Sequence, residues 1–397
     1  MSLPAGLRVV VLHNDDYADL TPEDPGYSAR ADVENAAWGV AEALIRRGLR
    51  AEVQGVDFPS LAEVLDYLAR DPPDLVFNLC ESLRGDARHE GVVPALLDLA
   101  GLPYTGSCPV ALGLALRKDR AKMILRTSGV PTPEWITVDA VDRIRGCRLP
   151  FPLIVKPTRE DASLGISSSS VVRSQPALEL AVGRVLVEFG QAALVERYVE
   201  GREMYVSLLG NHAPEALPLH EIDFSAMPEG LPRIVSYSGK WDEGSAEYHG
   251  TRPVRCLLDE TIRLRVVRAA CAAFEALELR DYGRVDVRLA ADNTPYVIDV
   301  NPNCDLTDGA GFSRAAGYGG LGYPQLIERV CEIALERHHR AARLRRPSAS
   351  PLLSPGGSAT TRGPSARGGD RQRRLVPTER GELRPRTERR SARPGSG

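Results

Sequence analysis

The sequence predicts an α/β region with a parallel sheet, followed by a strand-rich α+β region. Two observations lead to this fold class. Over the first third of the 397 residues, short apolar runs alternate with stretches whose apolar residues recur at helical spacing. From about residue 152 the apolar runs become more frequent, and a hairpin pattern closes this part of the chain. Strands that alternate with helices indicate a parallel sheet joined by helical crossovers.

The first third contains three expected strands and three expected helices. The strands are at residues 8–12, 50–56 and 74–79, and the helices at residues 33–44, 61–68 and 92–99. Loops at the carboxyl ends of parallel strands are the usual ligand sites. In this chain, those loops contain Asn14, Asp15, Asp16, Asn78 and Glu81.

The middle of the chain begins with a turn and one long expected helix. The turn is PYTGS at residues 103–107, the helix covers 110–126, and the breaker cluster VPTP at 130–133 marks an expected domain edge. The strands expected beyond it are 153–156, 165–172, 194–198, 202–209, 283–289 and 295–300. Helices are expected at 176–189 and 258–277, with a long polar loop at 236–252.

Charge is distributed unevenly along the chain. Residues 341–397 carry 14 arginines and four acids, a charge of +10, so the other 340 residues carry −13 of the net −3. The acidic body argues against nucleic-acid binding. The tail is rich in Arg, Pro, Ser and Gly, so we expect it to be disordered; a tether to nucleic acid or an anionic surface stays open as the alternative.

Other whole-chain features narrow the class of protein further. No run of about 18 apolar residues occurs, so a membrane span is not expected. The seven cysteines form no CxxC pair, which argues against a disulfide framework and against a zinc site. A reducing cytoplasm is the simplest compartment.

Lysine is rare in this chain, and its few positions together suggest contacts with phosphate. The chain has only four, Lys118, Lys122, Lys156 and Lys240. Lysine is a compact charge suited to a phosphate oxygen. Small residues and Gly165 in the loop at 158–166 would let backbone N–H groups approach an anion. Each feature alone is also compatible with a surface charge or an ordinary turn.

Three oxygen-bearing residues predict a magnesium site. Asp286 lies in RVDVRL, and Asp299 and Asn301 lie in VIDVNPN. If these segments pair as a hairpin, the three side chains converge at one end of the sheet. Two carboxylates and an amide oxygen suit Mg²⁺, which prefers about six oxygen ligands. Capping or salt-bridging acids are the alternative interpretation.

Seven segments taken together resemble the ATP-grasp superfamily, and most closely its D-alanine–D-alanine ligase branch. The similarity runs in consistent order from about residue 74 to 335. Its segments are PYTGS (103–107), RKDRAK (117–122), PTP (131–133), VKPTREDASLG (155–165), VERYVEGRE (195–203), RVDV (284–287) and DVNPN (299–303).

The resemblance implies a three-domain ATP-grasp fold, with ATP clamped between two α+β domains. The domains would be an N-terminal Rossmann-like domain (1–110), a central ATP-grasp domain (111–200) and a C-terminal ATP-grasp domain with the metal site (201–340), before the tail (341–397). Relatives of this fold often dimerise through the N-terminal domain, so a homodimer is an expectation.

The resemblance also implies a role for each matching residue. The nucleotide would be held by Lys118 and Lys156 at its phosphates, by Glu196 with the backbone of Tyr198 and Val199 at adenine, and by Glu203 at the ribose. Ser163 would cover the phosphates, Lys240 would reach the γ-phosphate, and Arg284 would stabilise the oxyanion. Asp286, Asp299 and Asn301 would hold two Mg²⁺ ions, with Mn²⁺ as an alternative.

The implied reaction joins a small-molecule carboxylate to an amine. Phosphorylation by ATP converts the carboxylate into an acyl phosphate, which the amine attacks to form an amide. Amino acids are the expected substrates. An ATP-grasp carboxylase, a true D-alanine–D-alanine ligase of cell-wall synthesis and a non-catalytic ATP-binding regulatory protein remain as other interpretations.

The departures from the family pattern cluster on the substrate side. A family serine falls on Ala162 and a family tyrosine on Trp241, and their side chains cannot rebuild the family's hydrogen-bonded network. Ala310 falls near the serine that holds the acceptor's carboxylate. Asp305 stands nearby and would favour a cationic or neutral amine. We therefore expect a ligase that joins different amino acids, or an amino acid and another amine.

Three further residues complete the expectations. His89 and Glu90 fall where the D-alanine ligases carry acidic residues, so they are expected to help position substrate. Cys304 lies beside the predicted metal ligands but has no histidine nearby in sequence, so it is expected to be a packing residue rather than a nucleophile.

Overall fold

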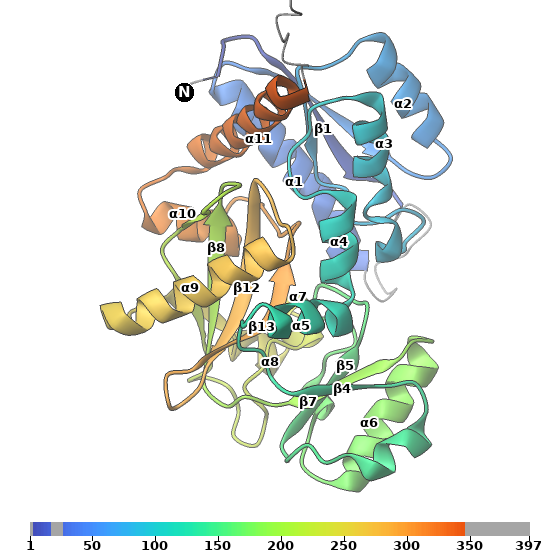
Figure 1. Cartoon of the computed structure of the whole chain (residues 1–397), viewed down its shortest axis with the longest axis vertical. Coiled ribbons are helices and arrows are strands. Elements are labelled where there is room, and N and C mark those ends of the chain that lie inside the picture. The colour runs from blue at the N-terminus through green and yellow to red at the C-terminus, as the bar shows by residue number, and fades with distance from the viewer. Residues whose placement is uncertain (1–2, 17–26, 346–397) are drawn as a thin grey trace, which may run out of the picture. The chain divides into compact units, whose positions relative to one another are not determined.

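The computed structural model describes residues 3–16 and 27–345 (Figure 1). Residues 346–397, which make up most of the predicted basic tail, therefore lie outside the described residues. Among those that are described, no helix combines the length and apolarity needed to cross a membrane. Three sheets organise this part of the chain.

The N-terminal sheet is parallel, as predicted. Its strands are ordered β2–β1–β3 and are β1 (Arg8–Asn14), β2 (Arg50–Val56) and β3 (Leu75–Asn78). Its helices are α1 (Tyr27–Arg46), α2 (Leu61–Arg70), α3 (Val92–Ala100) and α11 (Tyr323–Arg345). Successive strand residues point to opposite faces. Val9 and Val11 accordingly pack with α1 and α11, while Val10 and Leu12 pack with α2 and α3.

The second sheet has four antiparallel strands in the order β4–β7–β5–β6. They are β4 (Trp135–Val138), β5 (Leu153–Pro157), β6 (Val171–Val172) and β7 (Ala193–Arg197). Helix α6 (Gln175–Glu188) packs on this sheet through Leu178, Val182 and Val185. The segment also contains the short helices η2 (Val141–Gly146) and η3 (Ser168–Ser170).

The third sheet is antiparallel and has six strands. Its order is β11–β10–β8–β12–β13, and β9 pairs with β8. The strands are β8 (Arg202–Leu209), β9 (Glu215–Ala216), β10 (His220–Asp223), β11 (Arg252–Arg255), β12 (Tyr282–Leu289) and β13 (Pro295–Asn301). Helix α9 (Glu260–Ala276) covers it with buried residues such as Val266 and Phe274. The predicted hairpin is therefore present as β12 and β13.

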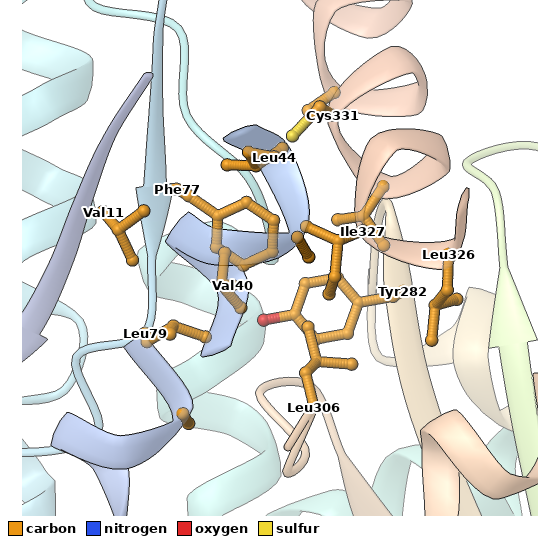
Figure 2. Close-up of a cluster of buried hydrophobic side chains, with 14 of the residues drawn as sticks. Val11, Val40, Leu44, Phe77, Leu79, Tyr282, Leu306, Leu326, Ile327 and Cys331 are labelled. Carbon is orange, nitrogen blue, oxygen red and sulfur yellow. The ribbon is translucent and has the colours of Figure 1, made fainter. Parts of the chain in front are cut away.

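One apolar cluster joins the N-terminal sheet to the start of β12 (Figure 2). Phe77 of β3, Leu326 of α11 and Tyr282 of β12 are all fully buried in it. The hydroxyl of Tyr282 donates a hydrogen bond to Asn303 at 2.9 Å. Because Asn303 lines the functional cavity, this core fixes one wall of the site.

One expected helix and one expected strand were wrong. The helix expected at 110–126 is two helices, α4 (Pro109–Leu116) and α5 (Lys118–Thr127), because Arg117 is non-helical with φ −85° and ψ 84°. The strand expected at 165–172 is mostly a turn and η3, where Ser167 and Ser170 form a capping box. The break at Arg117 places Lys118 at the first position of α5.

The polar loop expected at 236–252 contains two short helices, α7 (Tyr237–Trp241) and α8 (Ala246–His249). Ser236 and Ser245 cap them by accepting hydrogen bonds from Gly239 N and Tyr248 N. Elements that periodicity did not predict are β4, β9, β10, β11, η1 (Ala87–His89), η2, α10 (Gly311–Tyr318) and α11. Helix α11 ends at Arg345, so it continues past the predicted start of the tail at 341. The domain boundaries themselves stay predictions.

Candidate active site

A cavity of about 550 Å³ brings the predicted site residues together. All of them except Lys118 line it, although they come from segments up to about 150 residues apart. The lining members of the predicted set are Lys156, Ser163, Glu196, Tyr198, Val199, Glu203, Lys240, Arg284, Asp286, Asp299 and Asn301.

The register of β12 against β13 explains one wall of the cavity. Asp286 lies opposite Asp299, and Arg284 lies opposite Asn301. Residues two apart on a strand, and residues directly opposite across a pair, share a face of the sheet. Four polar side chains therefore gather at one end of the hairpin, as the sequence suggested.

Arg284 and Asp286 form a bidentate ion pair on this wall. Arg284 Nε lies 2.7 Å from Asp286 Oδ1, and Nη2 lies 3.0 Å from Oδ2. The guanidinium also stacks 4.6 Å over the ring of Tyr205. Burial raises the pKa of the Asp286 carboxyl, and Arg284 opposes that shift. The ion pair thus compensates the charge of a buried carboxylate with a partly buried guanidinium.

The oxygen donors at this end fit a magnesium ion. Asp286, Asp299 and Asn301 offer two carboxylates and an amide, which is the oxygen-only chemistry that Mg²⁺ prefers. The amide nitrogen of Asn301 lies 3.4 Å from Asp286 Oδ2, so these side chains are already close. Within residues 3–16 and 27–345, no group of three or more His, Cys, Asp or Glu side chains is placed to hold a metal ion.

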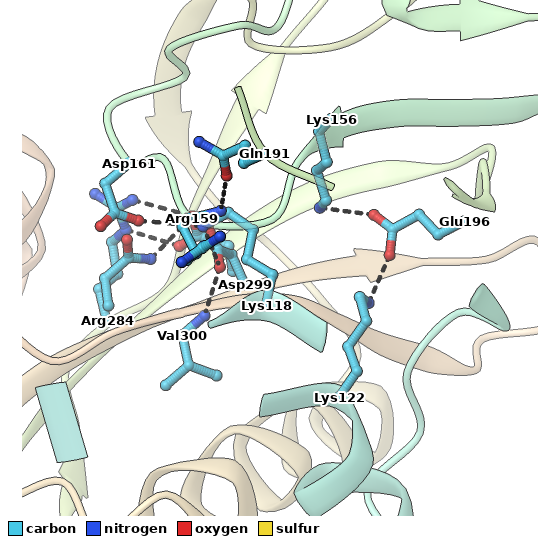
Figure 3. Close-up of polar contacts among 12 residues, drawn as sticks. Lys118, Lys122, Lys156, Arg159, Asp161, Gln191, Glu196, Arg284, Asp299 and Val300 are labelled. Carbon is cyan, nitrogen blue, oxygen red and sulfur yellow. Dashed lines mark hydrogen bonds and ion pairs between the residues drawn. The ribbon is translucent and has the colours of Figure 1, made fainter. Parts of the chain in front are cut away.

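Lys118 lies behind this wall and is paired with two carboxylates (Figure 3). Its Nζ is 3.3 Å from Asp299 Oδ2 and 3.1 Å from Asp161 Oδ1. The Lys118 side chain is only 6% exposed. Burial alone would lower the pKa of Lys118, but Asp299 and Asp161 outweigh it and raise the pKa. The ammonium therefore stays charged.

Lys156 and Glu196 belong to a buried ion triad that includes Lys122 (Figure 3). Lys156 Nζ and Lys122 Nζ each lie 2.6 Å from a different oxygen of the Glu196 carboxylate. Burial opposes ionisation of Glu196, yet the two lysines hold its pKa below the usual range. The sequence indicated Lys122 only as a rare lysine. It lies on α5, while Lys156 and Glu196 lie on the paired strands β5 and β7.

Glu203, the residue expected at the ribose, is held by two neighbours. Arg288 Nη2 lies 2.6 Å from Glu203 Oε2, and the Tyr205 hydroxyl donates to Oε1 at 3.1 Å. Glu203 and Arg288 are register partners on β8 and β12. Neither Arg288 nor Tyr205 was predicted. The register of β12 against β8 brings Arg288 beside Glu203, and Tyr205 lies two residues further along β8, on the same face.

The loop at 158–166 is fixed on both sides. Gly165 has φ +78°, and a Cβ there would come within 2.6 Å of Pro157 and 2.8 Å of Phe189, so the position requires glycine. Ala162 and Ser163 also have positive φ values, 52° and 63°. The loop therefore has a defined shape, with Ser163 on the cavity wall.

Residues of the segment at 236–252 contact this loop directly. The Trp241 indole N–H donates to the Ala162 carbonyl at 3.1 Å, and Tyr237 N donates to Ile166 O at 2.9 Å. The sequence predicted that these two side chains cannot rebuild the family's hydrogen-bonded network. The hydrogen bond that joins them uses the main-chain carbonyl of Ala162, which any residue offers. Lys240 lies 4.6 Å from the Trp241 ring.

Acidic groups line the cavity wall formed by the N-terminal region. Burial, reinforced by Asp305, raises the pKa of Glu81 to about 8. Glu90 is buried and accepts a hydrogen bond from Asn303 at 3.1 Å. His89 is exposed and does not line the cavity, so the structure separates it from Glu90.

Burial raises the pKa of Cys304 to about 12, which leaves it a protonated thiol suited to packing.

Comparison with known proteins gives the family. The model of the D-ala D-ala ligase C-terminus matches residues 124–332. A D-alanine–D-alanine ligase from Desulforudis audaxviator is 32% identical over 264 residues, which cover 64% of this chain and 80% of that protein. The chain belongs to the D-alanine–D-alanine ligase family. An uncharacterized protein of Sinorhizobium fredii, y4sG, is 34% identical over 67% of this chain and 78% of its own length.

Solved structures of this family share the fold. The ligase from Bacillus anthracis, crystallised in complex with ATP, has a TM-score of 0.65 and 23% identity, and covers 85% of this chain and 100% of its own. The ligase from Coxiella burnetii has a TM-score of 0.63. The ATP-grasp fold class and the assignment to ligases of this family are confirmed. The role of each residue stays a prediction.

Proposed function

We propose that this ligase uses ATP and Mg²⁺ to convert a small carboxylate into an acyl phosphate and then transfers the acyl group to an amine. The observation that carries the proposal is the convergence of lysines, aspartates and an arginine on one cavity. Lys156 and Lys240 suit phosphate oxygens, Asp286 and Asp299 suit the metal, and Arg284 suits a developing oxyanion. The ATP complex of the Bacillus anthracis relative supports the nucleotide.

The residues would act in two stages. In the first, Lys118, Lys156 and Lys240 hold the ATP phosphates while a carboxylate oxygen attacks the γ-phosphorus and ADP leaves. Mg²⁺ held by Asp286, Asp299 and Asn301 would offset charge on the transferring phosphoryl group. Protein surrounding Lys240 partly desolvates it and, with Arg284 nearby, lowers the pKa of its ammonium.

In the second stage the amine attacks the acyl phosphate. Its nitrogen forms the new bond to the carbonyl carbon, and the carbon–oxygen bond to phosphate breaks. Arg284 would stabilise the oxyanion between these events, and the loop at 158–166 with Trp241 would exclude water from the acyl phosphate. Water exclusion matters because hydrolysis would waste the activated group.

The substrate side supports a ligase that joins two different substrates. Ala310 offers no hydroxyl where the family serine would bind the acceptor's carboxylate, and Ala162 and Trp241 leave that family's side-chain network incomplete. Asp305 instead places a carboxylate on the cavity wall, while Glu81, whose pKa is raised to about 8, adds a largely protonated carboxyl. The Asp305 carboxylate favours a cationic or neutral amine over a second D-alanine.

The experiment combines ATP and Mg²⁺ with single amino acids, amino-acid pairs and amines, and measures ADP release and product mass. We expect product only from mixed pairs. A D-alanyl-D-alanine product from D-alanine alone would contradict the substrate proposal but not the ligase chemistry. Nucleotide binding without ADP release from any pair would favour the non-catalytic alternative.

A cytoplasmic reaction and a homodimer complete the proposal. The cytoplasm supplies ATP and keeps thiols reduced, which fits seven unpaired cysteines within the described residues. Light scattering with mass determination would test the dimer, and a monomer at micromolar concentration would contradict it.

A further inference from the structure

Asp161 makes a contact that neither the sequence nor the proposed reaction accounts for. Its Oδ1 lies 3.1 Å from Lys118 Nζ, the same ammonium that contacts Asp299 (Figure 3). Asp161 is 45% exposed on its loop, while Lys118 is almost completely buried. In this ion pair the Asp161 carboxylate is therefore accessible to solvent, and the Lys118 ammonium is not.

The loop holds Asp161 in place. Its backbone carbonyl accepts a hydrogen bond from Leu164 N at 2.9 Å, which closes a turn. The next residue, Ala162, is bonded to Trp241, and Gly165 packs closely against Pro157. The contact with Lys118 is therefore part of a defined loop structure rather than a chance position of a surface acid.

The same contact conflicts with nucleotide binding. Lys118 is the lysine expected to meet an ATP phosphate, and its buried ammonium is already in contact with the carboxylates of Asp161 and Asp299. A carboxylate and a phosphate in contact would repel each other, so the two anions compete for one cation. Asp299 differs because a metal ion can bridge it to the nucleotide.

We propose that Asp161 is an internal competitor for Lys118 that sets the affinity of the site for nucleotide. In the empty site its carboxylate satisfies the buried ammonium. On binding, a phosphate oxygen displaces it, and Asp161 turns to the solvent that already reaches it. This inference rests on the proposed function, because it requires that the cavity bind ATP.

The test compares binding of magnesium adenylyl-imidodiphosphate to the full chain and to Asp161→Asn by calorimetry. The substitution keeps the size of the side chain and removes its charge, so we expect binding about three- to tenfold tighter at low salt. The gain should shrink on going from about 0.05 to 0.5 M salt, because a competing charge is screened and a packing effect is not. In a Lys118→Met background the gain should largely vanish.

The matched control is Glu160→Gln in the same loop. Glu160 accepts a hydrogen bond from Gln191 at 2.7 Å and makes no contact with Lys118 among the contacts of the described residues. Its affinity should change less than twofold. Unchanged or weaker binding by Asp161→Asn, or an equal gain in Glu160→Gln, would overturn the inference. Failure of the unsubstituted chain to bind any nucleotide would instead overturn the proposed function, and the inference with it.

Discussion

The indole N–H of Trp241 donates a hydrogen bond to the main-chain carbonyl of Ala162 at 3.1 Å. This bond joins α7 to the loop at 158–166, and Lys240 stands beside it, 4.6 Å from the Trp241 ring. Trp241 thus connects the two segments expected to enclose the phosphates, and its ring contacts the neighbouring Lys240.

Replacing Trp241 by Phe should loosen this closure without removing the ring. One lost hydrogen bond is worth roughly 1 kcal/mol, so kcat/KM should fall about fivefold. Phosphate release should also exceed amide formation, because water would reach the acyl phosphate. Parallel assays of phosphate and product measure this ratio. Trp38→Phe, on the exposed face of α1, is the control, and equal ratios in both variants would contradict the prediction.

Arg284→Met should separate catalysis from nucleotide binding. The methionine keeps an apolar side chain over Tyr205 but cannot stabilise an oxyanion, so kcat should fall on the order of 100- to 1,000-fold. Nucleotide binding should persist, because the lysines and the opposite strand are unchanged. Steady-state kinetics and calorimetry measure the two effects. A variant with near-normal kcat would remove Arg284 from the reaction.

Much of this site was predictable because its chemistry lies in short segments. The hairpin pattern alone suggested that Asp286, Asp299 and Asn301 converge, and the register of β12 and β13 agrees. Residues that act through distant partners gave no such signal. Arg288 reaches Glu203 across 85 positions, and Asp161 meets Lys118, the first residue of α5, across 43.

The prediction of local structure was wrong where polar residues cap short helices. Periodicity detects apolar stripes, but Ser236 and Ser245 start short helices in a polar stretch by accepting backbone hydrogen bonds. The prediction of one long helix over 110–126 was wrong for the opposite reason. Its apolar spacing continues through Arg117, whose backbone is nevertheless turned out of the helix.

Glu196→Gln should destabilise the fold as well as the nucleotide site. Two buried lysines would lose their shared counter-charge, and breaking such a pair typically costs about 3 kcal/mol. Urea unfolding measures the loss. The exposed pair of Arg143 and Asp139 provides the control, since Asp139→Asn should cost less than about 1 kcal/mol. Equal losses in the two variants would show that the triad is not structural.

His220 should make the protein sensitive to acid. Burial, with Arg284 and Arg314 nearby, lowers the pKa of its ring from 6.5 to about 3. Below about pH 6.5 the His220 ring binds a proton in the unfolded chain but not in the folded chain, so the free energy of unfolding falls as pH falls. The share from His220 between pH 7 and 5 is about 2 kcal/mol.

Denaturant unfolding at both pH values tests this share. His220→Leu removes the titrating group, so its stability should depend less on pH by about that amount. His212→Leu, at an exposed position, should behave like the unsubstituted protein. An unchanged pH dependence in His220→Leu would show that the buried ring is not the source.

The acyl phosphate is the central claim, and oxygen transfer tests it most directly. The carboxylate substrate found in the amino-acid screen is labelled with ¹⁸O at both oxygens and converted with ATP and its amine partner. If the carboxylate oxygen attacks phosphorus, one ¹⁸O leaves with the phosphate, and mass spectrometry of the released phosphate will show one label per amide formed. Unlabelled phosphate released together with amide product would contradict the account.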